Sequence, residues 1–273
     1  MQVHSELLLV GVFAGAVAIG CTVAIERLGG RIGGLIGTLP TTIVPASIGL
    51  FSATEGVGFE QAMGAVPVGM LINAIFLWTW RVLPSRLPNW SVRRRLILMV
   101  IGSLGLWSVI ATLSVIAMRY VRSHALLVGG CATVVMASFG AWACRTHVPA
   151  PRGRRPVSAA QLLSRGVLAA IAIAAAVAVG DSGAELAAGV ASVFPAIFLT
   201  TMTSLWMSQG EAVPSGAVGP MMLGSTSVSG YALIATWLFP WLGIGLGSAL
   251  SWLLAVLFLT VPAWLWLTGS ERR

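Results

Sequence analysis

Two stretches of this sequence place proline next to threonine and serine inside long apolar runs. Proline removes a backbone N–H from a helix and frees a carbonyl one turn earlier. Nearby hydroxyls can then satisfy the backbone, which gives a kinked packing helix, or they can present a polar patch to a solute or ion. The residue types leave both interpretations open. The candidate residues are Pro40, Thr41, Thr42 and Pro45 in the first stretch, and Pro195, Thr200 and Thr201 in the second.

Two carboxylates, Glu55 and Glu211, precede apolar segments at nearly equivalent places in the two halves of the chain. A charge held at membrane depth costs several kcal/mol unless it is paired or hydrated, so such groups are often functional. One carboxylate at each mouth of a pathway would suit proton- or cation-coupled alternating access. The alternative is that both lie in wet loops and cap helix N-termini, where a carboxylate is favourable.

Asn73 is the one asparagine inside an apolar segment. Its amide can hydrogen-bond across helices or contact a solute, and the interhelical bond is the simpler expectation. Pro220 lies in a segment rich in glycine and proline, which predicts a broken or closely packed helix. Asn73 therefore joins the threonines and the carboxylates as a candidate pathway residue, and Pro220 joins the other prolines as a predicted helix break.

The composition excludes several other kinds of chemistry. All sixteen basic residues are arginine, so the chain has no P-loop lysine and no Schiff-base lysine. ATP-driven pumping by this chain alone is therefore excluded. The three cysteines and three histidines lack metal-ligand spacing, so we expect neither a metal nor a cofactor. Residues 180–183 match the tetrapeptide around a serine-protease nucleophile, but no histidine lies near enough for a triad. We therefore expect that the protein is not an enzyme.

The elements that carry these residues are predicted to lie in lipid. Hydrophobic residues make up 57% of the chain and charged residues only 9%, against roughly 25% charged in a soluble domain. Long apolar runs without period-two alternation predict helices, not a barrel. The predicted fold class is an all-α polytopic membrane protein with about nine transmembrane helices. The segments are residues 5–26, 33–53, 59–81, 96–118, 124–144, 161–180, 186–208, 212–238 and 241–268.

Arginine marks one face of this arrangement. With nine spans, all but two of the sixteen arginines fall in loops of one face, and Arg119 and Arg122 alone lie on the other. The positive-inside rule then places the N-terminus outside and the C-terminus in the cytoplasm of a bacterial inner (plasma) membrane. The basic excess is a topology signal, so nucleic acid is not an expected partner. The expected partners are the lipid bilayer and a small solute or ion, and a homo-oligomer stays open.

The hydropathy pattern repeats along the chain. Residues 34–40 recur as residues 189–195, an offset of 155, and the first four segments then map onto the last four. A single unpaired helix between two four-helix units turns the second unit over. We therefore predict two inverted four-helix repeats joined by a central helix (4+1+4), an architecture of secondary transporters. The units are residues 1–120, a central helix with a Pro/Arg-rich linker at 121–158, and residues 159–273.

The run from Glu26 to Thr42, with its Gly-Gly pairs and the Leu-Pro step at Pro40, resembles the opening of a known group. These are the small four-helix bacterial inner-membrane proteins of the GlpM-like type. The resemblance covers roughly residues 5–118. It implies a four-helix unit, here duplicated and fused through the central helix. It implies no activity, because none is well established for that group.

These patterns together predict a secondary transporter or channel with its site at the interrupted helices of the two repeats. A membrane assembly module that transports nothing is one alternative, and it would have a dry interface of small residues in place of a polar cavity. A lipid flippase is another, and it would have a lateral opening lined with arginine.

Overall fold

A computed structural model of the chain describes residue 12 and residues 39–54, 56–146 and 159–269. Regular structure in these residues is helical throughout, which confirms the all-α prediction. Five helical stretches of the described residues are long and apolar enough to cross a membrane, and they indicate a multi-pass membrane protein. The predicted first span, the start of the second and most of the predicted linker lie outside the described residues.

The helices of the first half and the centre follow the apolar segments closely. Glycine and proline occur inside them, but long apolar runs with few charges still favour helix, because a helix satisfies its own backbone groups in lipid. Two short 3-10 turns, η1 (Pro84–Arg86) and η2 (Arg122–His124), lie in the loops before α5 and α6. The helices are α3 (Ile43–Ala53), α4 (Val57–Val82), α5 (Val92–Arg119) and α6 (Ala125–Arg145).

The second half contains shorter pieces. The predicted span 186–208 is two helices on either side of Pro195, and the predicted span 212–238 is divided near Ser225. A π-helical turn, η3 (Val256–Thr260), joins the last two helices. The helices are α7 (Ala159–Asp181), α8 (Glu185–Ser192), α9 (Ala196–Gln209), α10 (Ala212–Gly224), α11 (Thr226–Ala255) and α12 (Val261–Gly269).

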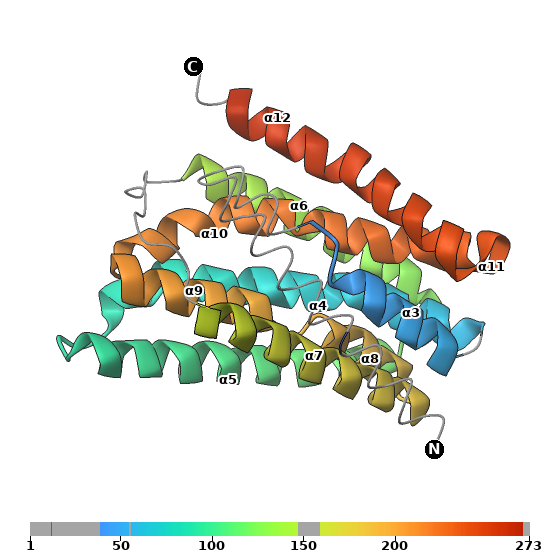
Figure 1. Cartoon of the computed structure of the whole chain (residues 1–273), viewed down its shortest axis with the longest axis horizontal. Coiled ribbons are helices and arrows are strands. Elements are labelled where there is room, and N and C mark those ends of the chain that lie inside the picture. The colour runs from blue at the N-terminus through green and yellow to red at the C-terminus, as the bar shows by residue number, and fades with distance from the viewer. Residues whose placement is uncertain (1–11, 13–38, 55, 147–158, 270–273) are drawn as a thin grey trace.

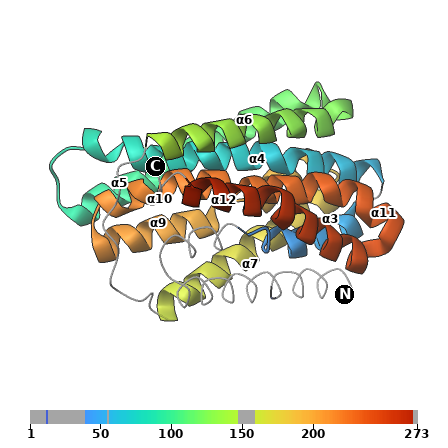
Figure 2. The same ribbon diagram turned by 90° about the horizontal axis from the view of Figure 1, so that it is seen from above.

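The last apolar stretch, Pro214–Gly269, reverses direction inside α11. Gly243 has φ 71° and ψ 172°, a conformation that glycine adopts easily because it has no Cβ. After Gly243 the chain turns back, and α12 runs in the direction opposite to α10 (Figures 1 and 2). The 56 residues therefore form two arms joined by a bend.

Successive long helices run in alternating directions between two ends of the molecule (Figure 1). Helices α4 and α6 finish at one end, where α5 and α10 begin, and we call this the Arg-rich end. The bend at Gly243 and the loops after α3, α5 and α7 lie at the other end. The described arginines of the Arg-rich end are Arg81, Arg86, Arg93, Arg94, Arg95 and Arg145. The opposite end carries Arg119 and Arg122 with Glu60, Asp181 and Glu185.

Helix α4 forms the centre of the molecule. It packs against α5, α6, α8, α10 and α11, and most of its side chains from Phe59 to Trp80 are buried. Helix α5 is peripheral and exposes a stripe of large apolar side chains, as a helix that faces lipid does. Two of the candidate pathway residues, Thr42 and Asn73, lie where α3, α7 and the α8–α9 break approach the middle of α4.

Candidate functional site

An asparagine from α4 holds the break between α8 and α9. Proline at position 195 has no N–H, and the chain leaves the helix between Ser192 and Ala196, with the Ala196 N–H donating to the Phe194 carbonyl at 2.7 Å. Asn73 donates its side-chain N–H to the Val193 carbonyl at 2.7 Å. The break thus exposes a carbonyl that a side chain of α4 satisfies.

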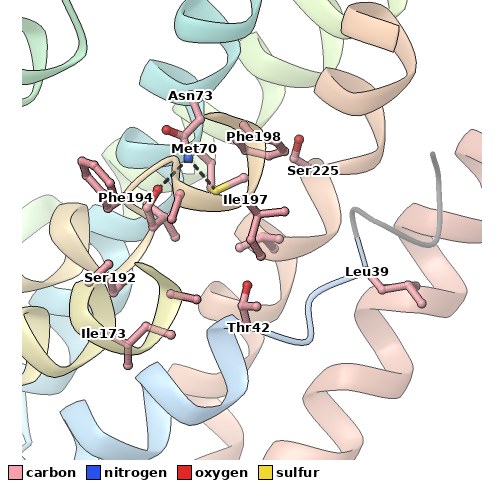
Figure 3. Close-up of a pocket in the computed structure, with 15 residues that line it drawn as sticks. Leu39, Thr42, Met70, Asn73, Ile173, Ser192, Phe194, Ile197, Phe198 and Ser225 are labelled. Carbon is pink, nitrogen blue, oxygen red and sulfur yellow. Dashed lines mark hydrogen bonds between the residues drawn. The ribbon is translucent and has the colours of Figure 1, made fainter. Parts of the chain in front are cut away.

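Asn73 is itself held from the other side. The indole N–H of Trp107, on α5, donates to Asn73 Oδ1 at 2.7 Å, and Asn73 is 2% exposed. Its amide N–H also lies 3.6 Å from Met70 Sδ (Figure 3). Both polar atoms of this buried amide therefore have protein partners, and the residue joins α4, α5 and the α8–α9 break. We call the Trp107–Asn73–Val193 chain the amide bridge.

The start of α3 contains a second proline turn. Pro40 is buried, and the Thr41 N–H donates to the Leu39 carbonyl at 2.7 Å across it. Helix α3 then begins at Ile43, with Thr42 as its N-cap residue. Pro45 lies buried in the first turn, where a missing N–H costs no helical hydrogen bond.

A small cavity lies between these two proline turns. Its volume is about 60 Å³. A water molecule needs roughly 10–15 Å³ by such a measure, so the cavity has room for a few waters. No lining residue carries a charge. The lining comes from the start of α3 (Leu39, Thr42), α4 (Met70, Asn73), α7 (Ala169, Ala172, Ile173), the α8–α9 break (Ser192, Val193, Phe194, Ala196, Ile197, Phe198) and the α10–α11 junction (Ser225, Val228).

The hydroxyl of Thr42 is available to hydrogen-bond a bound solute. Thr42 points from the start of α3 toward Ile197 (Figure 3), and its hydroxyl makes no hydrogen bond to any described residue. Ser192 donates to the Gly189 carbonyl at 2.7 Å, and Ser225 donates to the Met221 carbonyl. Ile197 and Phe198, in the first turn of α9, also line the cavity, and the first backbone N–H groups of a helix have no partner within it. The cavity can therefore donate hydrogen bonds to a small polar group.

Three of the predicted threonines do not line this cavity. Thr41 lies in a separate groove between α3 and the arm of α11 after Gly243. The Thr200 hydroxyl donates to the carbonyls of Ala196 and Ile197, at 2.8 and 3.1 Å, which is the backbone-bonded alternative. Thr201 is half-buried on α9. The structure thus brings Thr42 and Asn73 together at the cavity and places the other hydroxyls elsewhere.

Of the two acidic candidates, Glu211 is not among the residues that line the cavity. Glu211 is the N-cap residue of α10 at the Arg-rich end, and its carboxylate lies 2.8 Å from Arg95. Glu55 lies outside the described residues. Pro220 lies inside α10, which continues to Gly224. In residues 39–54, 56–146 and 159–269, no three His, Cys, Asp or Glu side chains gather where they could hold a metal ion.

Sequence reasoning missed three polar members of the site. Trp107, Ser192 and Ser225 sit in apolar or glycine-rich runs that resemble ordinary packing sequence. The repeat contains a signal for one of them, because Ser225 is 155 residues after Met70, which faces the same cavity. Comparison of the chain with protein-family models, with curated proteins and with solved structures found no match.

Proposed function

We propose that the protein is a secondary transporter of a small solute, built from two inverted repeats, with its binding site in the cavity between the two proline turns. The observation that carries the proposal is the position of this cavity. It lies where two proline turns from opposite halves of the chain meet. Interrupted helices that meet at a repeat interface are a recurring form of transporter binding site.

The repeat is supported by the lining of the cavity itself. If a two-fold axis relates two halves, residues on that axis come from equivalent positions of both halves. Four pairs of lining residues are each separated by 155 positions, the offset found in the hydropathy. The pairs are Leu39 and Phe194, Thr42 and Ile197, Met70 and Ser225, and Asn73 and Val228.

Backbone conformation supports the same relation. The Thr41-to-Leu39 and Ala196-to-Phe194 hydrogen bonds are both 2.7 Å long, and both span a proline. Donors and acceptors are again 155 residues apart. The two prolines therefore sit in the same tight turn, although the flanking sequences share few residues.

The central helix α6 is contacted in matching ways by the two halves. A Cβ on Gly64 of α4 would lie 2.7 Å from the Ala125 carbonyl carbon, at the start of α6. A Cβ on Gly219 of α10 would lie 2.9 Å from the Cys144 backbone nitrogen, at its end. Gly64 and Gly219 are also 155 residues apart. Close backbone approach at both ends of α6 is expected if a two-fold axis crosses its middle.

The direction of the helices supports the proposed inversion of the two halves. Helices α3 and α9 run in opposite directions, and so do α4 and the α10–α11 arm (Figure 1). The proposed topology is 4+1+4 with nine spans, of which the two arms around Gly243 are the last. We propose that the Arg-rich end faces the cytoplasm, as the positive-inside rule requires, with the N-terminus outside.

Cysteine accessibility tests this function without a known substrate. In a background with Cys21, Cys131 and Cys144 changed to Ala, Thr42→Cys would be reconstituted in proteoliposomes and exposed to a membrane-impermeant methanethiosulfonate reagent. Because the cavity has room for only a few waters, the test is whether the reagent reaches Thr42→Cys from each side of the membrane. We expect modification of Thr42→Cys when the reagent is outside only, and also when it is inside only.

The matched control is Thr200→Cys, since Thr200 lies outside the cavity lining and bonds to its own helix. We expect it to stay unmodified from both sides. Protection of Thr42→Cys from both sides would indicate a closed packing interface and favour the assembly module. Modification from one side only would show a pocket without alternating access, and would also contradict transport.

Lipid handling is a second candidate because of a lateral groove. The groove lies between α3 and the second arm of α11, has a volume of about 450 Å³ and includes Val44, Ile48 and Trp252. Its lining contains no arginine, whereas a flippase for phosphorylated lipids needs cationic contacts for the headgroup. The groove thus suits an acyl chain better than a passing headgroup, and transport of a small solute stays the first proposal.

A further inference from the structure

The loop before α5 concentrates positive charge that the protein does not neutralise. Arg86 lies in η1, and Arg93 and Arg94 lie in the first turn of α5, all three exposed. None of the three makes a hydrogen bond or ion pair with another residue in the described part of the chain. Their neighbour Arg95 is different, because it is paired with Glu211 and donates to the Pro84 carbonyl.

This placement is electrostatically unfavourable without an external anion. The first turn of α5 contains no acidic residue, although a helix N-terminus carries partial positive charge and favours anions. Arginines there repel one another and the helix dipole. An anion bound between them would remove both costs.

The geometry of α5 places these arginines at headgroup depth. The helix has 28 residues and is therefore about 42 Å long, against a hydrocarbon core of about 30 Å. If the helix is centred on the core, its first turn lies in the headgroup region. Trp90, which is 50% exposed, lies just before the N-cap residue Ser91, and tryptophan favours that interface.

The face of α5 that follows Arg93 is apolar and exposed. Ile97 and Ile101 follow Arg93 at intervals of four residues, so the three side chains share one face of α5. Ile97 is 56% exposed and Ile101 is 64% exposed. A phospholipid whose acyl chains cover these two isoleucines brings its phosphate to Arg93.

We propose that Arg86, Arg93 and Arg94, flanked by Trp90, form a binding site for the headgroup of an anionic phospholipid. The lipid phosphate is held by the guanidinium groups, and its acyl chains lie along the exposed stripe of α5. The site is separate from the central cavity, so the proposal does not depend on the transport function.

Lipid binding by the purified protein tests this site. The full chain would be titrated with a fluorescent phosphatidylglycerol and, as the neutral comparison, a fluorescent phosphatidylcholine. The variant carries Arg86→Gln, Arg93→Gln and Arg94→Gln together, and the matched control carries Arg119→Gln and Arg122→Gln at the opposite end. Because each arginine near a lipid surface contributes about a factor of five, we expect roughly 100-fold weaker phosphatidylglycerol binding in the triple variant. Control and phosphatidylcholine binding should stay unchanged.

A second measurement keeps the test valid if the triple variant folds poorly. High salt should weaken phosphatidylglycerol binding by the wild-type protein and leave phosphatidylcholine binding unchanged. Inorganic phosphate at the same concentration as the lipid should not compete. Full competition by phosphate would indicate a site for a free anion and would overturn the lipid assignment. Equal binding by the triple variant, or an equal loss in the control, would also overturn it.

Discussion

The two proline turns around the cavity share a backbone conformation but are held in different ways. At Pro195 the turn is tied directly to α4 and α5 by the amide bridge. Among the described residues, no side chain of α4, α5 or α11 ties the Pro40 turn in this way, and the residue 155 positions after Asn73 is Val228, which has no polar side chain. Helix α3 is anchored further along instead, where Ser47 Oγ lies 2.8 Å from Tyr231 Oη.

This difference separates the contacts that determine the backbone conformation of a proline turn from the contacts that attach the turn to the core. Both turns contain a proline and the same 2.7 Å backbone hydrogen bond, although Asn73 contacts only the turn at Pro195. The amide decides how firmly a turn is attached to the core. We therefore expect the turn at Pro40 to be displaced more easily than the turn at Pro195 when the cavity opens.

Replacing Asn73 by valine, the residue type found 155 positions later at Val228, should make the two turns alike. The change leaves the Val193 carbonyl and the Trp107 N–H buried without partners. We expect a loss of about 2–4 kcal/mol in the free energy of unfolding, measured by SDS titration in mixed micelles. Trp107→Phe removes one bond of the same chain and should lose about half as much. A stability equal to that of the wild-type protein in Asn73→Val would show that the amide bridge does not hold the break.

Much of this architecture can be predicted from hydropathy and proline chemistry, and the polar contacts cannot. Long apolar runs predict helices because lipid leaves the backbone no other partner, and proline predicts the interruption at position 195. Hydropathy does not report which polar group faces which. Asn73 meets a carbonyl 120 residues away and an indole 34 residues away, and only the folded chain brings them together.

The threonines illustrate the same limit. Thr42 and Thr200 have the same chemistry and similar apolar surroundings in the sequence. Thr42 is the N-cap residue of α3, makes no capping hydrogen bond with its side chain, and faces the cavity. Thr200 lies one turn inside α9, so its hydroxyl bonds to its own helix. The position within the helix, which sequence boundaries fix only to within a few residues, decides which hydroxyl is available.

The two glycines that contact α6 test whether the halves are equivalent in packing. Gly64→Ala and Gly219→Ala each place a methyl group under 3.0 Å from the α6 backbone. We expect both to destabilise the protein by about 1–3 kcal/mol, and by similar amounts. Gly102→Ala on the open face of α5, where a Cβ meets nothing within 4 Å, is the control and should be neutral or slightly stabilising. A large cost at one glycine alone would break the proposed symmetry of α6.

Glu211→Gln should have the smallest effect and separates a structural role from a coupling role. The carboxylate pairs with Arg95 at 2.8 Å, and the two side chains are 26% and 18% exposed. A partly exposed ion pair contributes up to about 1 kcal/mol, so the loss of stability should be small and should shrink at high salt. If Glu211 serves only this pair, Gln should leave the modification of Thr42→Cys unchanged at every pH. If Glu211 couples opening to proton binding, Gln should remove the pH dependence of that modification that exceeds the ionisation of the thiol itself, while the protein stays folded. The second outcome would make the Arg-rich end part of the transport cycle, because a group at the mouth would then control the cavity between the two proline turns.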